Sequence, residues 1–205
     1  MFRASVKLAA ATQSLFTVVS VSYGALGGSL DNQEPQEPLL DAKYYQHVTH
    51  LITNMYSGQG MQLTNYQPDD SNTWFGASVA PTVQIDDQVS FADPAAICQG
   101  APEVEEAFRA LSKIQPISLS PPTLVNVQPH GDTIALTYYL HQQYGGRLRV
   151  KSLCVVRVVL REGRFVVHRV EEAWNGVPLL DTLPFSVCRR INGGVSWFLT
   201  TNLVK

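Results

Sequence analysis

Residues 115 to 175 contain four apolar stretches separated by short turns, and this feature limits the possible folds most. The stretches run over 123–127, 133–141, 147–160 and 165–174, and the turns between them contain Gly131, Gly145, Gly146 and Gly163. Short glycine-containing turns join antiparallel neighbours, whereas parallel strands need long crossover connections. The region therefore predicts a meander of long antiparallel strands.

The stretch 147–160 indicates that one face of this sheet is buried. Apolar and polar residues alternate along it, as they do in a strand whose successive side chains point to opposite faces. One face would carry Leu148, Val150, Cys154, Val156, Val158 and Leu160, and the other Arg149, Lys151, Arg157 and Arg161. The first of these faces is predicted to be the buried one.

Two helices are expected ahead of the meander. Pro38 stands where a helix can begin, and apolar residues recur at helical spacing over 38–58. A second helix is predicted over 102–113, with acidic residues in its first turn. Between the two helices, residues 58–82 are rich in turn-forming residues, and a long loop of this kind often carries function. A strand is predicted to follow over 83–91.

Composition limits the class of protein. A chain of 205 residues is long enough for one well-filled domain with extensions, and 45% apolar with 16% charged residues suits a soluble globular core. The formal net charge of −2 argues against a general attraction to nucleic acid. Residues 1–146 carry a net charge of −8 and residues 147–205 one of +6. The C-terminal part could therefore meet anionic lipid or an acidic partner, unless its arginines only cover the outer face of the strands.

The first 30 residues have the composition of a mitochondrial targeting segment. They contain Arg3 and Lys7, many hydroxyl side chains and no acidic residue. A secretory signal is the alternative, because the apolar stretch 15–26 ends in small residues, and an uncleaved anchor is another. Residues 31–38 resemble a linker. We expect a mitochondrial protein, with the secretory pathway as the alternative.

The C-terminal tail, residues 181–205, is dense in apolar residues and also carries Arg189 and Arg190. Apolar residues at this density must be covered by the rest of the domain, by a protein partner or by a membrane surface. A protein partner or a homodimer could meet the chain through the sheet or through residues 178–205. The tail is therefore a candidate contact surface.

The order of elements resembles that of the nuclear transport factor 2-like superfamily, and within it the SnoaL-like and ketosteroid-isomerase-like proteins. The segments that carry the likeness are 89–94, which includes Asp-Pro, 100–108 and 170–175. The domain would span residues 39–180. The resemblance implies an α+β fold in which a strongly curved antiparallel sheet wraps round helices and encloses a pocket. The N-terminal segment and the C-terminal tail would be additions to that cone.

The resemblance also implies a candidate catalytic base. Asp93 stands at the position where ketosteroid isomerases place a general base, and a partly desolvated carboxylate there can take a proton next to a carbonyl group. Asp-Pro is also a common turn, which is the structural alternative. The isomerases add two oxyanion donors, and the matching positions here hold Leu51 and Val155. Without those donors the chain is not expected to catalyse that isomerisation.

The stretch 165–174 offers a second set of candidate residues. Because side chains alternate along a strand, His168, Glu172 and Trp174 are predicted to share one face. If this face lines the cone, the histidine and the glutamate suit acid–base catalysis or the binding of a polar ligand group. The alternative is a structural histidine that bonds to Glu172 or to the backbone.

The lining of the implied pocket, and the absence of a cofactor and of a metal, can also be predicted. Tyr44, Trp74, Tyr138 and Trp174 are the candidate lining residues. No cofactor is expected, because the sequence has no glycine-rich phosphate loop. No metal is expected, because His47 and His50 have helical spacing but no carboxylate or cysteine completes a ligand set. Cys98, Cys154 and Cys188 likewise show no metal-ligand spacing, and their odd count argues against a disulfide framework.

Two functions stay open. The first is non-catalytic: a cone domain that binds an apolar small molecule or serves as an accessory subunit of a larger, mitochondrial assembly. The second is a cofactor-free isomerase, cyclase or dehydratase that acts on an apolar carbonyl compound through Asp93 or through His168 and Glu172. The two differ in whether these three side chains meet inside one closed pocket, because an enzyme needs that convergence.

Overall fold

The computed structural model describes residues 2–28, 30, 42–57, 81–113 and 116–203. The predicted linker over 31–38 lies outside the described residues, as does most of the predicted loop over 58–82, including Trp74. The helices are α1 (Phe2–Leu26), α2 (Gln46–Met55), α3 (Ala101–Lys113) and α4 (Phe185–Leu203), with a 3₁₀ helix, η1 (Ala42–Tyr45), directly before α2. Both predicted helices are present, as α2 and α3.

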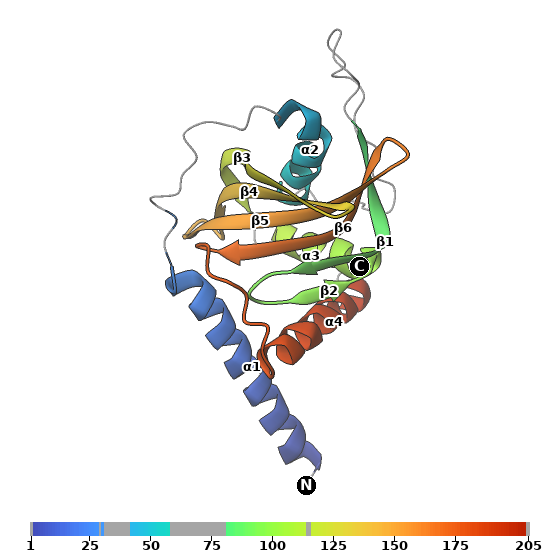
Figure 1. The fold of residues 1–205 in the computed structure, drawn as a ribbon. Coiled ribbons are helices and arrows are strands. Elements are labelled where there is room, and N and C mark those ends of the chain that lie inside the picture. The colour runs from blue at the N-terminus through green and yellow to red at the C-terminus, as the bar shows by residue number, and fades with distance from the viewer. Residues whose placement is uncertain (1, 29, 31–41, 58–80, 114–115, 204–205) are drawn as a thin grey trace.

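One six-stranded sheet forms the body of the fold (Figure 1). Its strands are β1 (Thr82–Ala92), β2 (Ile97–Gln99), β3 (Ile117–His130), β4 (Thr133–Tyr144), β5 (Leu148–Arg161) and β6 (Arg164–Trp174), in the spatial order β2-β1-β6-β5-β4-β3. Strands β3 to β6 pair antiparallel with their neighbours, and β1 pairs parallel with β6. The predicted meander is confirmed, and the β1–β2 hairpin extends it at one edge.

The sheet is curved, and α2 and α3 pack against its inner face. Buried side chains of α2, Val48, Leu51, Ile52 and Met55, share one core with Val104 and Phe108 of α3 and with the inward-facing residues of the strands. Register shifts interrupt β3 and the β5–β6 pair, and such bulges bend a strand and increase its twist. The fold is therefore α+β with a curved, mostly antiparallel sheet wrapped round helices, as predicted.

A bulge at His168 changes which residues of β6 face the core. In the register of β5 and β6, Arg157 is opposite Arg169 and Val158 is opposite Val167, so His168 is the extra residue. Side-chain alternation is reset at such a bulge. Phe165 and Val167 face the core before it, and Val170 and Glu172 are buried after it. The prediction that His168 and Glu172 share one face is wrong for this reason: strict alternation was assumed across the bulge.

The two ends of the chain pack together beside the β1–β2 hairpin (Figure 1). The predicted tail forms α4, which lies against α3 and β2, and α1 lies against α4 and β6. Phe16 of α1 contacts Phe185 of α4 edge to face, with ring centroids 5.4 Å apart. Among the described residues, no helix combines the length and apolarity that crossing a membrane requires. The mitochondrial location and the secretory alternative stay predictions.

Candidate functional site

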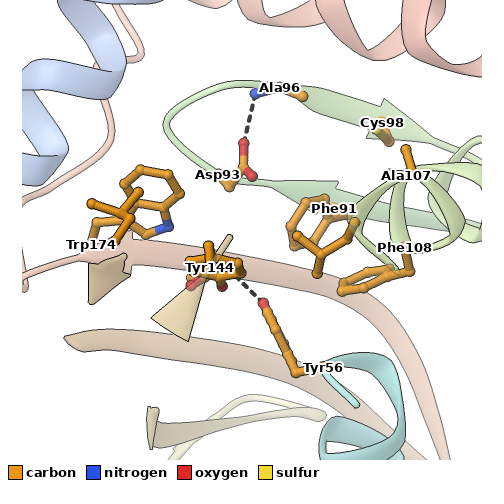
Figure 2. A pocket seen from close by; sticks show the side chains of 13 residues that line it. Tyr56, Phe91, Asp93, Ala96, Cys98, Ala107, Phe108, Tyr144 and Trp174 are labelled. Carbon is orange, nitrogen blue, oxygen red and sulfur yellow. Dashed lines mark hydrogen bonds between the residues drawn. The ribbon is translucent and has the colours of Figure 1, made fainter. Parts of the chain in front are cut away.

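A cavity of about 180 Å³ lies between α3 and the inner face of the sheet (Figure 2). Its walls are mostly apolar, and its polar side chains come from the turn after β1, from β4 and β6, and from the residue after α2. The lining residues are Tyr56, Phe91, Asp93, Ala96, Cys98, Ala107, Phe108, Ala110, Leu111, Tyr144, Leu148, Glu172 and Trp174. A concave apolar site with a few converging polar groups is the usual form of a small-molecule site.

The cavity exists because small side chains stand where the helix faces the sheet. Ala107 and Ala110 on α3, and Ala96 after the Asp93 turn, line the space without filling it. Phe91 and Phe108 form a wall, with ring centroids 4.9 Å apart, and Phe108 also meets Tyr56 edge to face. The aromatic wall keeps the site apolar, while the alanines leave room for a ligand.

Glu172 is a buried carboxyl group at one end of this cavity. It is 2% exposed, and it accepts hydrogen bonds of 2.8 Å from the Tyr56 hydroxyl and of 2.8 Å from the Ser152 hydroxyl. Burial and then the nearby charge of Asp93 raise the pKa of Glu172 to about 7, although the two hydrogen bonds favour the ionised form. Glu172 therefore changes protonation near neutral pH.

Asp93 is the second carboxyl group, and it combines a turn role with a place in the cavity wall. Its Oδ1 atom accepts a 2.8 Å hydrogen bond from the backbone N–H group of Ala95. It also accepts one of 2.6 Å from the N–H group of Ala96 (Figure 2). Burial raises the pKa of Asp93, and these two bonds and the charge of Arg189 act in the opposite direction. Asp93 therefore fills both the predicted turn role and the predicted place at the pocket.

Trp174 and Tyr144 close the polar end of the cavity (Figure 2). Their rings stack with centroids 6.4 Å apart, and the Tyr144 hydroxyl donates a 2.7 Å hydrogen bond to Gln142. Trp174 Nε1 is buried close to Glu172 and favours its ionised form, but within the described residues the two groups do not reach full hydrogen-bond geometry. A buried donor without a partner is costly, so a ligand oxygen at this point would complete the site.

The structure brings together some of the predicted site residues and separates others. Asp93, Glu172 and Trp174 all line the cavity. His168 lies outside it, because the bulge places this side chain off the inner face. Burial and the neighbouring arginines lower the pKa of His168, against the effect of Asp86. The predicted catalytic role of His168 depended on a pocket face shared with Glu172, and the structure does not place His168 there.

Two of the predicted pocket aromatics lie outside the cavity, near η1 and α2. Tyr138 is fully buried in the core, where the Thr49 hydroxyl donates to its oxygen at 3.2 Å. Tyr44 is 38% exposed and packs on Phe165, with ring centroids 5.5 Å apart. Neither lines the cavity. Trp74, the fourth predicted lining residue, is outside the described residues.

Sequence reasoning missed Tyr56 and Ser152, the two hydroxyl donors to Glu172. The positions compared with the oxyanion donors of the isomerases were Leu51, which is fully buried in the core, and Val155 on β5. Tyr56 stands just past the end of α2, one helical turn after Ile52. Extending the apolar spacing of that helix by one more turn would have placed Tyr56 on the inner face.

The arrangement can recognise polar groups and can move a proton. Two carboxyl groups share one low-polarity site, so the charge of each disfavours ionisation of the other. Near neutral pH, Glu172 can donate a hydrogen bond when protonated and accept one when ionised. Within the described residues, no group of three histidine, cysteine or acidic side chains is placed to hold a metal ion.

Comparisons with known proteins bear on the fold. No family model matches the chain, and no curated protein matches it. A variant of the protein Rd1NTF2_05 with five substitutions matches at 14% identity and a TM-score of 0.44, covering 64% of this chain and 96% of that one. A protein of unknown function with a cystatin-like fold from Nostoc punctiforme matches at 17% identity and a TM-score of 0.35, covering 47% and 75%.

A third solved structure, described as a SnoaL-like polyketide cyclase from Mesorhizobium loti, matches at 13% identity and a TM-score of 0.34, covering 42% of this chain and 75% of that one. These proteins are similar to the chain in fold alone. Structures named as NTF2 and SnoaL-like proteins are among those that the chain matches, and all three TM-scores are below 0.5. The site described above rests on this chain's own residues.

Proposed function

We propose that this protein binds a small, mostly apolar molecule that carries one polar group, in the cavity between α3 and the sheet. The observation that carries the proposal is the unpartnered Trp174 N–H at the end of an apolar cavity that also holds Asp93 and Glu172. The cavity of about 180 Å³ is smaller than the ~300–1,000 Å³ of a typical drug-sized site. The ligand is accordingly compact.

The polar groups of the site favour a carbonyl or hydroxyl compound. A carbonyl oxygen can accept from Trp174 Nε1 and from protonated Glu172, and a hydroxyl group can also donate to a carboxylate. A carboxylic acid ligand would place a third acidic group beside Asp93 and Glu172 and would be disfavoured by like-charge repulsion. An amine would meet two carboxyl groups but would leave the Trp174 donor without a partner.

A matched panel tests this choice. Acetophenone, 1-phenylethanol, 1-phenylethylamine and benzoate share one ring and differ in their polar group, and calorimetric titration of the full chain at pH 7 compares them. We expect the ketone and the alcohol to bind best and benzoate least. Glu172→Gln and Trp174→Phe should weaken ketone binding, and His168→Ala, outside the cavity, should leave it unchanged. Equal binding by Trp174→Phe and wild type would contradict the proposal.

Proton transfer next to a carbonyl group is the second candidate function. The observation that favours it is that Asp93 and Glu172 line one cavity and that Tyr56 donates to Glu172. A carboxylate with a raised pKa is a stronger base toward a carbon acid, and a protonated partner can stabilise the oxyanion that forms. An isomerase, cyclase or dehydratase acting on an apolar carbonyl compound would use this step.

Deuterium exchange separates the two functions. Acetophenone incubated in D₂O with the protein would lose its methyl protons in the NMR spectrum if the site abstracts a proton from that carbon. Exchange by wild type that disappears in folded Asp93→Asn would make catalysis the better proposal. Binding without exchange would favour the non-catalytic function. The predicted role as a subunit of a larger mitochondrial assembly stays a prediction.

A further inference from the structure

The turn that carries Asp93 is held from outside by side chains of α1 and α4. Arg189 Nε of α4 donates a 2.8 Å hydrogen bond to the Asp93 carbonyl oxygen. The Ser20 hydroxyl of α1 donates to the Pro94 carbonyl oxygen at 2.6 Å. Asn192 Nδ2 of α4 donates to the Ala95 carbonyl oxygen at 2.8 Å. Three consecutive carbonyl groups of one turn are therefore bonded by the two ends of the chain.

Glycines let both helices approach this turn closely. A Cβ atom added at Gly24 of α1 would lie 2.9 Å from Pro94 Cγ, and one added at Gly193 of α4 would overlap the carbonyl oxygen of Ile97. Neither contact is possible for a larger residue without a shift of the helix or of the turn. The two helices thus meet the turn on its outer side, while Asp93 forms part of the cavity wall and its carboxyl group is directed toward the Ala96 N–H (Figure 2).

The two helices are also bonded to each other at the turn. Asn192, which reaches the Ala95 carbonyl group, donates to the Thr17 hydroxyl at 2.8 Å and accepts from Gln13 Nε2 at 2.7 Å. Gln13 Nε2 also donates to the Cys188 carbonyl oxygen at 3.0 Å. The Asn192 side chain that bonds the turn is thus itself held by Gln13 and Thr17 of α1.

We propose that α1 and α4 form a clamp on the Asp93 turn and that Ser20, Arg189 and Asn192 are positioning residues that fix how the Asp93 carboxyl group enters the cavity. The inference deepens the proposed function and rests on it only for the link to ligand binding. The inner side of the turn is already fixed by the Ala95 and Ala96 N–H groups on the carboxylate. The clamp supplies the outer side, so the carboxyl group has one preferred direction.

Arg189 adds a charge to this geometry. Its side chain is 1% exposed, and its Nη1 atom pairs with Asp181 at 2.9 Å. The groups that act electrostatically with Asp93 are Arg189 from α4, Glu172 from β6, Cys98 from β2 and Tyr144 from β4. Over residues 13–26, α1 contributes uncharged side chains. Arg189 is the cation in this set, and its charge favours the ionised form of Asp93.

Amide hydrogen exchange of the full-length protein tests the clamp without a ligand. In Ser20→Ala and in Asn192→Ala we expect the Ala95 and Ala96 N–H groups to exchange about fivefold faster, the factor that corresponds to one hydrogen bond of about 1 kcal/mol. Asn54→Ala on α2 and Ser57→Ala just past its end are matched controls, far from the turn in sequence and half-buried or exposed, and should leave both rates unchanged. Unchanged rates in the two α1–α4 variants would overturn the proposal.

A carboxyl NMR titration tests the positioning role of Arg189. We expect the pKa of Asp93 to rise in Arg189→Gln, because the charge that favours the carboxylate is removed, and to stay near the wild-type value in Arg189→Lys. Arg190→Gln is the control, because this neighbour pairs with Glu103 of α3 at 2.8 Å. An unchanged Asp93 pKa in folded Arg189→Gln would contradict the role. If Arg189→Gln does not fold, amide exchange in Ser20→Ala and Asn192→Ala decides whether the clamp exists.

Titration with acetophenone tests the link between clamp and cavity. We expect about fivefold weaker binding by Ser20→Ala and Asn192→Ala than by their α2 controls, because a looser turn gives the carboxyl group more than one direction. Faster amide exchange with unchanged affinity would overturn the link to the cavity. If the wild type binds no member of the panel, the proposed function fails, while the amide exchange and the Asp93 titration still decide whether the clamp exists.

Discussion

The inner face of the sheet has two ends that are built differently. Beneath α2, large side chains fill the space: Tyr45 stacks on Phe165 with ring centroids 5.4 Å apart, and Leu51 and Tyr138 are fully buried. Beneath α3, alanines face the sheet, and a cavity with two carboxyl groups remains. The same curved sheet therefore supports a packed end and a hollow end.

The difference shows how one sheet can provide both stability and a binding site. Close packing at the α2 end contributes dispersion and apolar burial. At the α3 end these contributions are smaller, and polar groups are desolvated there at a free-energy cost. Loss of a side chain should therefore be costly at the packed end, whereas a change of charge should matter more at the hollow end.

The largest effect is expected from Leu51→Ala at the packed end. Leu51 is fully buried on α2, and a cavity left in a well-packed core costs about 2–5 kcal/mol together with the lost apolar burial. The matched change at the hollow end is Leu111→Ala on α3, which enlarges a space already present and should cost about 1 kcal/mol. Urea denaturation of both variants measures the two free energies of unfolding. Equal losses in the free energy of unfolding would show that the two ends of the inner face do not differ in packing.

The second effect is a pH dependence that comes from Glu172. Its pKa is about 7 in the folded protein against 4.5 for the free side chain. Between these values the folded state binds more protons than the unfolded state, so stability falls as the pH rises from about 4.5 to about 7. The loss from this group is at most about 3 kcal/mol and is fully present above pH 7.

Chemical denaturation at a series of pH values measures this dependence. Glu172→Gln should remove most of the fall in stability between pH 4.5 and 7, because the amide cannot ionise. A smaller fall should remain in the variant, since burial also raises the pKa of Asp93. Glu171→Gln, the next residue along β6, lies outside the cavity and is the control. If the free energy of unfolding of Glu172→Gln falls between pH 4.5 and 7 as steeply as that of wild type, the pKa of Glu172 is not raised at the hollow end.

Much of the fold could be predicted from the sequence, because its signals are local. Glycine turns and strand alternation predicted the meander, and Pro102 with the acidic first turn predicted α3. The bulge at His168 could not be predicted, since it depends on how β6 pairs with both β5 and β1. One extra residue there moved His168 off the inner face while it left Glu172 and Trp174 on the cavity side.

The site could be predicted only in part, for a similar reason. Asp93 was predicted from the family resemblance and Glu172 from side-chain alternation along 165–174, and both line the cavity. Tyr56 and Ser152 were missed, because their hydroxyl groups become donors to Glu172 only when the end of α2 and strand β5 are brought together with β6. The clamp of α1 and α4 joins residues more than 170 positions apart, such as Thr17 and Asn192, and is a product of tertiary structure alone.

A third prediction concerns added volume. Ala107→Leu at the hollow end should change the free energy of unfolding by less than about 1 kcal/mol and should block acetophenone binding, because the new side chain occupies the cavity. Val48→Phe at the packed end adds volume where none is free and should cost about 1–3 kcal/mol. Thermal unfolding and calorimetry measure both effects. Strong destabilisation by Ala107→Leu would mean that the cavity is not available to a ligand.

The smallest effect is expected from Asp93→Asn, the substitution that separates the turn role from the charge. The amide oxygen of asparagine can still accept from the Ala95 and Ala96 N–H groups, so the turn is kept. Removing a buried charge relieves desolvation, and losing the attraction to Arg189 opposes that gain. The net change in the free energy of unfolding should therefore stay within about 1 kcal/mol.

Asp93→Ala is the companion variant, because it also removes the acceptor. It should cost more than Asp93→Asn by about 1–3 kcal/mol, since two backbone donors in a buried turn lose their partner. Urea denaturation at pH 7 gives the difference between the two variants. If Asn and Ala destabilise equally, the turn bonds contribute little, and the negative charge of Asp93 is what the hollow end requires. That outcome would favour a chemical role for Asp93 over a structural one.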